Sequence, residues 1–362
     1  MVASVRGMSI RLSLEAESKE FSEMISTWTK TCQDGHSACK SSTSTRTLPT
    51  RVIDVGSPDG RTAPHPCDTN GEPGDYIALS HCWGGKQPLR TTKENMCSMK
   101  TCIPWAKLPN TFQDAIAVTR RLGIRCLWID SLFIVQDDAQ DWEREAARMA
   151  LIFEAAYLTI AATAATDGSQ GLFPRERGHE FVMGSSEVEP HVFMREKRSD
   201  GCFLPRRLNT GPVSIDVEVD YKVDGLYPLQ ERAWCFQELV LSPRVLHFTH
   251  SEVVWHCRTK WDCECGAVGL GGSYIRKFDT FIQNPAGYEE EDEFAKSVQW
   301  PDIKAADPSG SWRGIVSVFT SNQITYREDI LPALSGTAKK FGLLRTGRYV
   351  AGLWEDSFAN DL

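Results

Sequence analysis

Apolar and polar positions between residues 76 and 166 follow two alternating patterns. Short apolar runs occur at YIALS (76–80), IRCLWID (124–130) and LTIAATAA (158–165), and such runs are typical of buried strands. Between them, two segments repeat apolar side chains at helical spacing. Strands that alternate with helices predict an α/β core with a mainly parallel sheet that is covered on both faces.

The two helical segments carry their own boundary signals. In the first, residues 109–123, either Asn110 or Thr111 can cap the start, and Gly123 can end the helix. The second, residues 137–157, is predicted as one helix, with Asp137 and Asp138 as capping residues in its acidic first turn.

The flanks are less regular. Before the core, we expect an amphipathic helix over residues 1–30 and a mostly irregular connection over 31–75 with strand potential near 51–55. After residue 166, the pattern predicts a strand at 213–223, a helix at 229–241 and a hairpin over 244–257. Loops over 262–311, with an acidic run at 289–293, and two helices complete the tail. The chain therefore divides into a lead-in (1–75), a core (76–257), and a loop-rich segment with C-terminal helices packed on the core (258–362).

Composition narrows the function classes. Of 362 residues, 41% are apolar, which is enough for a substantial core, and the net charge of −8 argues against a nucleic-acid partner. The sequence contains neither a signal-peptide pattern nor an apolar run long enough to span a membrane. We therefore expect a cytoplasmic protein whose twelve cysteines are reduced thiols.

Polar side chains follow two of the predicted strands. Ser80 ends the first, and His81, Trp83 and Gly84 follow it; Asp130 ends the second, and Ser131 and Gln136 follow it. In parallel α/β sheets, ligands bind beyond the carboxyl ends of the strands, so these residues form a candidate binding site if the strands are neighbours. Each also has a structural interpretation: Asp130 as a loop cap, His81 as a core side chain and Trp83 as a packing residue.

Familiar chemical motifs are absent. The sequence has no phosphate-binding P-loop, and GAVGLGGS (266–273) does not follow a strand and open a helix. His256, Cys257, Cys263 and Cys265 lack the paired spacing of strong zinc sites, so we predict no metal site. His81 and Cys82 point to opposite faces while the strand continues, which argues against a Cys–His pair.

Three long blocks resemble the fungal heterokaryon-incompatibility (HET) domain. They begin at YIALSHCWGG, LPNTFQDAIAVTRRLG and LQERAWCFQELVL, and the resemblance covers residues 76–257. The later DILPALSGTAKKF and YVAGLWEDSF are similar to a segment that often follows the domain. Phe133 stands where the family usually has Cys, and the chain stops just after AGLWED, where relatives usually continue, so it is either a short or a truncated member.

The resemblance implies a role in fungal non-self recognition, where such domains trigger cell death after incompatible cells fuse. It also implies a TIR-like (flavodoxin-like) three-layer core, and some TIR domains hydrolyse NAD with a Glu on the helix after a central strand. By position that residue is Glu145, with Asp130 as a second catalytic carboxylate. Trp83 would stack on the base. Arg232 either reaches a phosphate or pairs with Glu238, for which Arg244 is another candidate partner.

These implications leave three functions open. The protein is a cell-death effector with NAD as a substrate and no cofactor, a non-catalytic interaction module that binds protein partners or itself, or a scaffold recruited as a biosynthetic enzyme. Whether it is an enzyme remains open at this point. Glu145 itself is either a solvated surface carboxylate or a side chain that points over the strand ends.

Overall fold

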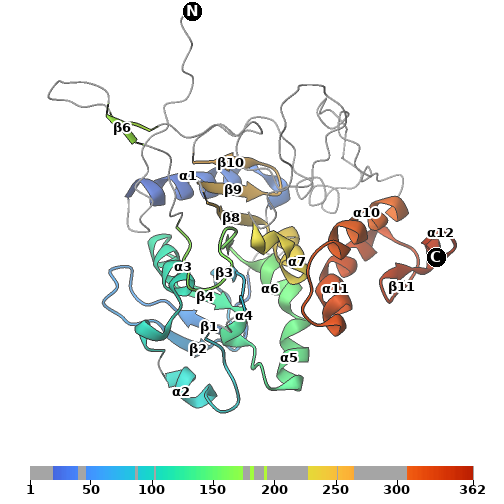
Figure 1. Ribbon diagram of the computed structural model, residues 1–362, viewed down its shortest axis with the longest axis horizontal. Helices are drawn as coiled ribbons and strands as arrows, with labels where there is room; N and C mark the ends of the chain where they lie inside the picture. The colour runs from blue at the N-terminus through green and yellow to red at the C-terminus, as the bar shows by residue number, and fades with distance from the viewer. Residues whose placement is uncertain are drawn as a thin grey trace, which may run out of the picture.

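A computed structural model describes residues 19–39, 46–85, 89–101, 103–173, 180–182, 191–193, 227–250, 252–264 and 308–361 (Figure 1). It shows a mixed α/β fold in which helices cover a central sheet. The predicted strand at 213–223, the GAVGLGGS segment and the acidic run at 289–293 lie outside the described residues.

The main sheet has eight strands in the order β10-β9-β8-β5-β3-β4-β1-β2. Its strands are β1 (Arg51–Asp54), β2 (His65–Asp68), β3 (Tyr76–Ser80), β4 (Cys126–Ile129), β5 (Leu158–Ala161), β8 (Arg244–Phe248), β9 (Val253–Cys257) and β10 (Trp261–Cys263). The central strands β4, β3, β5 and β8 are parallel, whereas β1 and β2 on one side and β9 and β10 on the other are antiparallel. The predicted parallel sheet is therefore confirmed for the centre, and hairpins extend both edges.

The strand order places a reversal at β3. The chain moves from β3 outward to β4, then crosses back to β5 and β8 on the other side. Ligands in such sheets bind at this switch point, beyond the carboxyl ends of the strands. The loops after β3, β4 and β5 therefore surround the place where a ligand site is expected.

Helices lie on both faces of the sheet (Figure 1). The described helices are α1 (Lys19–Gly35), α2 (Met96–Thr101), α3 (Asn110–Arg121), α4 (Asp130–Phe133), α5 (Ala139–Ala146), α6 (Met149–Ala155), α7 (Ala233–Leu241), α10 (Pro308–Thr320), α11 (Ile330–Phe341) and α12 (Phe358–Asp361). Figure 1 shows α3 and α6 on opposite sides of β3 and β4. The helix α1 lies on the face opposite α7, where Phe21 packs 6.2 Å from Phe248.

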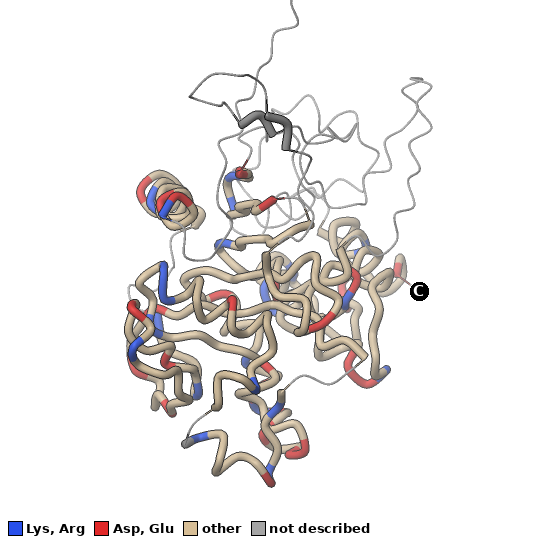
Figure 2. The backbone as a smooth tube through the Cα atoms, turned by 60° about the vertical axis from the view of Figure 1, so that its left-hand side comes forward, with Lys and Arg blue, Asp and Glu red and all other residues tan. Residues whose placement is uncertain are grey.

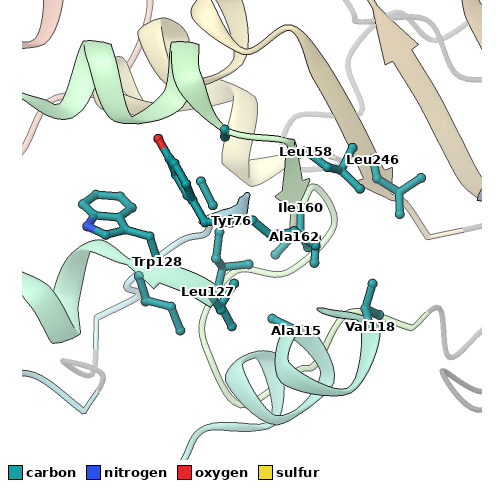
Figure 3. Close-up of a cluster of buried hydrophobic side chains, with 14 of the residues drawn as sticks. Tyr76, Ala115, Val118, Leu127, Trp128, Leu158, Ile160, Ala162 and Leu246 are labelled. Carbon is teal, nitrogen blue, oxygen red and sulfur yellow. The ribbon is translucent and has the colours of Figure 1, made fainter. Parts of the chain in front are cut away.

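Apolar side chains fill the space on both sides of the parallel strands (Figure 3). Leu127 points toward Ala115 and Val118 of α3, whereas Tyr76 and Trp128 point toward α6. The Tyr76 hydroxyl donates a hydrogen bond to the Ile152 carbonyl oxygen at 2.5 Å, which satisfies its polar end inside the core. Both faces of the central strands are thus buried, as parallel strands require.

The helix boundaries differ in part from the prediction. The residue before α3 is Pro109, and the side chain of Asn110 instead donates to the Ser169 carbonyl oxygen, so neither Asn110 nor Thr111 caps the helix. Gly123 follows the helix with a φ of 71°, which confirms its role at the end.

The predicted helix over residues 137–157 is two helices, α5 and α6, separated at Ala147 and Arg148. Asp138 caps α5 by accepting from the backbone N–H groups of Gln140 and Asp141, which confirms the prediction for this residue. Asp137 does not cap the helix and instead accepts from the backbone N–H of Lys93. The break allows α5 to lie over the start of β1 while α6 covers the sheet.

The region before β3 contributes to the sheet. The predicted strand near 51–55 is confirmed as β1, and β2 pairs beside it, with Ile53 opposite Pro66. The sequence pattern does not predict β2, because His65–Asp68 contains Pro66 and two polar residues and has no apolar alternation.

The C-terminal helices build a second apolar cluster against α7. Trp312 of α10 and Phe341 of α11 pack 5.3 Å apart, and Phe236 of α7 packs 5.9 Å from Phe319 of α10.

Acidic and basic positions are interspersed along the described backbone (Figure 2). Among the described residues, no helix has both the length and the apolar character that crossing a bilayer requires.

Candidate functional site

The expectation that the first two strands are neighbours is confirmed. β3 and β4 pair in parallel, with Leu79 opposite Ile129. Ser80 is the last residue of β3, and Asp130 follows β4 as the first residue of α4, so the two polar segments begin at the same edge of the sheet. This edge is the switch-point edge where a ligand is expected.

Asp130 is held by two donors. The indole N–H of Trp83 donates to its Oδ2 at 2.8 Å, and the backbone N–H of Ser131 donates to its Oδ1 at 2.7 Å. The Asp130 side chain is nevertheless 18% exposed, so the carboxylate is oriented by the protein without being sealed from solvent. A fixed, accessible carboxylate is suited to stabilising positive charge on a bound molecule.

His81 lies beside this carboxylate inside the protein. Its Nδ1 is 3.6 Å from Asp130 Oδ1, and its ring packs edge-on at 5.0 Å from Phe112. Among the described residues, neither ring nitrogen has a hydrogen-bond partner. Burial lowers the pKa of His81 despite the nearby Asp130 charge, so the imidazole is neutral at neutral pH.

Glu238 is the second carboxyl group of the site. It lies on α7, whose side chains are almost all buried, and Ser80 Oγ donates to its Oε2 at 2.6 Å. Burial, reinforced by the negative charge of Asp130, raises the pKa of Glu238 to about 8, although Ser80 and Arg232 oppose the shift. Glu238 is therefore largely protonated at neutral pH.

Arg232 connects α7 to the loop after β3. It precedes the first residue of α7, and its Nη1 donates to the His81 carbonyl oxygen at 3.3 Å. Burial alone would lower the pKa of Arg232, but the surrounding Cys235, Cys82, Glu238 and Asp130 raise it. Arg244, the other candidate partner of Glu238, bonds instead to Cys32 Sγ and the Tyr157 and Cys39 carbonyl oxygens.

The loop after β3 is closely packed at Gly84. Gly84 has a φ of 72°, and a Cβ atom built there would lie 2.4 Å from Asp167 Cβ in the loop after β5. Only glycine fits both the conformation and the space. The loops on the two sides of the switch point are therefore in direct contact.

For two other predicted binding residues, no side-chain hydrogen bond to Asp130 or Glu238 is found among the described residues. Ser131 is fully buried, and its Oγ has no partner among the described residues. Gln136 donates from its side chain to the Ile134 carbonyl oxygen and from its backbone to the Thr91 carbonyl oxygen. Gln136 thus stabilises its own loop.

Glu145 has a different set of neighbours. Thr50 Oγ1 lies 3.0 Å from both of its carboxylate oxygens, and Arg51 and Arg148 lie 3.7 Å and 3.9 Å from Oε1. The Glu145 side chain is 3% exposed, so it is not a solvated surface carboxylate. These contacts join α5 to the start of β1, and none of the hydrogen bonds described for Glu145 reaches Asp130.

Burial in the protein accounts for two further positions, Cys82 and Phe133. Burial raises the pKa of Cys82 to about 11, so this thiol is protonated at neutral pH. Phe133, where the resemblance leads us to expect Cys, is buried in the main core beside Leu132 and Ile134. Its packing fills the position without any polar contact.

Sequence reasoning identified Glu238 only as a partner for arginine. A usable signal was present, because this carboxylate lies in AWCFQELVL, a helix whose side chains are apolar on nearly every face. A carboxyl group in such a helix must be buried, and a buried carboxyl group has a raised pKa.

Comparison with known proteins gives one match. Residues 76–238 match the family described as "Heterokaryon incompatibility protein (HET)". No curated protein and no solved structure matches the chain.

Proposed function

Because residues 76–238 match the HET family, we propose that the protein acts in fungal non-self recognition as a cell-death effector. We further propose that its strand-end site hydrolyses the bond between nicotinamide and ribose in NAD. The observation that carries this proposal is Asp130, a partly exposed carboxylate that Trp83 and the backbone of Ser131 hold at the switch point.

The strand order supports a flavodoxin-like, and hence TIR-like, core. The parallel strands follow the spatial order β4-β3-β5-β8, which in chain order is second, first, third, fourth. Flavodoxin-like sheets begin with the same order and bind a nucleotide at this switch point. A nucleotide ligand at the loops of Ser80 and Asp130 fits that rule.

The proposed chemistry needs a negative charge beside the ribose. When the bond between ribose C1′ and the nicotinamide nitrogen breaks, the electron pair leaves with neutral nicotinamide and the sugar becomes oxocarbenium-like. Asp130 would stabilise this cation. Water then bonds to C1′ and gives up a proton, so that the products are nicotinamide, ADP-ribose and H⁺.

The neighbouring groups divide the remaining tasks. Burial keeps Glu238 largely protonated, whereas the side chain of Asp130 is partly exposed to solvent. Two carboxyl groups in such different environments are typical of sites that use acid–base catalysis. Arg232 is cationic at the same edge and suits a phosphate of the ligand. The indole of Trp83 offers a partly exposed face for a base, while its N–H holds Asp130.

The catalytic role of Glu145 remains a proposal alongside that of Asp130. Its carboxylate is surrounded by Thr50 and three arginines, so in this arrangement it would act by positioning α5 near the site. Separate substitutions distinguish the two carboxylates.

The test is release of nicotinamide from NAD by the purified full chain, followed by chromatography. Asp130→Asn should lower the rate about a hundredfold or more, since it removes the stabilising charge. Glu145→Gln tests the second carboxylate, with Glu143→Gln as the control because Glu143 is exposed on the same helix. Equal rates for Asp130→Asn and the unchanged protein would contradict the proposed chemistry.

A second candidate function is a protein-interaction module. Large apolar side chains are exposed near the C-terminal helices: Tyr326, Ile330, Leu331, Leu343 and Val350. Leu343, at 78%, is the most exposed of these side chains, and a contiguous exposed apolar patch can mark a protein-interaction site. If the protein kills cells by self-association, overexpression of Asp130→Asn should stay toxic, whereas Leu343→Asp should lower both toxicity and the mass measured by light scattering.

A further inference from the structure

A second group of reactive side chains lies on the opposite face of the sheet from Glu238. Cys32 lies in α1, His36 follows that helix, Cys39 ends the short 3₁₀ turn η1 (Ser37–Cys39), and Cys257 ends β9. One ligand atom from each residue lies within 4.8 Å of all the others. Cys32, Cys39 and Cys257 are buried, and His36 is partly exposed.

The spacing of these atoms suits a tetrahedral ion. Zinc binds thiolate sulfur at about 2.3 Å and imidazole nitrogen at about 2.0 Å, which places tetrahedral ligands roughly 3.6–3.8 Å apart. His36 Nδ1 is 3.4 Å from Cys257 Sγ. Small side-chain rotations would bring the four ligand atoms to coordination distance.

A buried positive charge, that of Arg244, lies beside the cysteines and would balance the negative charge of bound thiolates. Arg244 is buried in the core, and its Nε lies 3.3 Å from Cys32 Sγ while Nη2 donates to the Cys39 carbonyl oxygen at 2.9 Å. Among the described residues, no carboxylate is within ion-pair distance of Arg244. Three thiolates and one Zn²⁺ carry a net charge of −1, which this buried guanidinium would neutralise.

One backbone N–H and one hydroxyl group also lie close to the sulfur atoms. The N–H of Lys260 points at Cys257 Sγ with a distance of 3.3 Å, and the Thr259 hydroxyl lies 3.7 Å from Cys39 Sγ. Hydrogen bonds of this kind to ligating sulfur orient the ligands and stabilise the thiolate form.

We propose that Cys32, His36, Cys39 and Cys257 bind one structural zinc ion. Four protein ligands leave no coordination position for a substrate, which is the pattern of structural sites. The ion would join α1 to β9, where Trp28 already packs 6.2 Å from Trp255. His36 and Cys257 are 221 positions apart, so the ion would fasten the N-terminal helix to a distant part of the chain.

The first test is the metal content of the full chain purified without added metal or chelator. Elemental analysis should give about one zinc per chain. Cys39→Ser and Cys257→Ser should contain well under one equivalent, while Cys126→Ser should keep it, because Cys126 lies on β4 away from the group. A chelator should lower the thermal midpoint of the unchanged protein and of Cys126→Ser.

A second measurement does not depend on variants that fold. Removal of zinc followed by addition of Co²⁺ to the unchanged protein should produce the visible absorption bands of a tetrahedral thiolate site. The inference is overturned if the purified protein contains no zinc and binds neither Zn²⁺ nor Co²⁺. A disulfide between two of the three cysteines in protein purified under reducing conditions would overturn it as well. Either result leaves the NAD proposal untouched, because the two sites share no residue.

Discussion

The indole N–H of Trp83 donates a 2.8 Å hydrogen bond to Oδ2 of Asp130, and so links the loop after β3 to the end of β4. An aromatic side chain at this position therefore does more than offer a surface for a base. It also sets the direction of the carboxylate that the proposed reaction requires.

Trp83→Phe should separate these two roles, because it keeps an aromatic ring and removes the donor. We expect a loss of about 1 kcal/mol of stability from the missing hydrogen bond and a lower rate of nicotinamide release. Urea unfolding and the NAD assay measure the two effects. Trp105→Phe is the control, since Trp105 is 44% exposed; equal effects from both variants would argue against an orienting role for Trp83.

The raised pKa of Glu238 predicts how the free energy of unfolding depends on pH. Its pKa is raised to about 8 in the folded chain, from an ordinary value of 4.5, so between these values the folded state binds more protons than the unfolded state. Stability from this group is fully present below about pH 4.5 and is lost as the pH rises through about 8. The thermal midpoint of Glu238→Gln should therefore fall less steeply over this range than that of the unchanged protein. If the thermal midpoints of the two proteins change equally with pH, the result would contradict a buried, protonated Glu238.

Gly84 and Gly85 offer a matched pair for the loop contact. Gly84→Ala should destabilise the protein by roughly 1–3 kcal/mol, because it forces a left-handed residue and a clash with Asp167. Gly85→Ala should have little effect, since, chain neighbours aside, no atom of the described residues lies within 4 Å of a Cβ at that position. Denaturant unfolding of both variants tests whether the loops after β3 and β5 meet as described.

Glu145→Gln should reveal a structural role whether or not NAD is hydrolysed. The change removes the charge beside Arg51 and Arg148 and weakens the hydrogen bond from Thr50, and hydrogen bonds to charged groups contribute about 1.5–3 kcal/mol. We expect a loss near the lower end, because Arg148 is partly solvated. A variant with normal stability and no NAD turnover would instead favour direct catalysis by Glu145.

The sequence was informative where periodicity is strong. The alternating apolar pattern predicts β3, β4, β5 and α3 close to their observed bounds, because buried parallel strands and an amphipathic helix leave regular signals. The neighbouring positions of Ser80 and Asp130 follow from that topology. Trp83 and His81 join them because they belong to the same short loop.

The missed features depend on contacts between distant parts of the chain. Local pattern cannot show that Ser80 meets Glu238, 158 positions later, or that Cys257 belongs with Cys32 and Cys39 rather than with Cys263. His256 and Cys257 point to opposite faces of β9, and His256 stacks on Trp261 at 4.2 Å. The sequence positions next to Cys257 therefore do not identify the residues that lie beside it in the fold.

Pro66 gives the outermost strand β2 an edge that resists further growth. It has no N–H to offer, so an incoming strand would lack a donor at the middle of this four-residue segment. If cells build ordered polymers of this protein, these would not grow by adding strands to β2, and a cross-β ribbon templated on this edge is disfavoured from the outset.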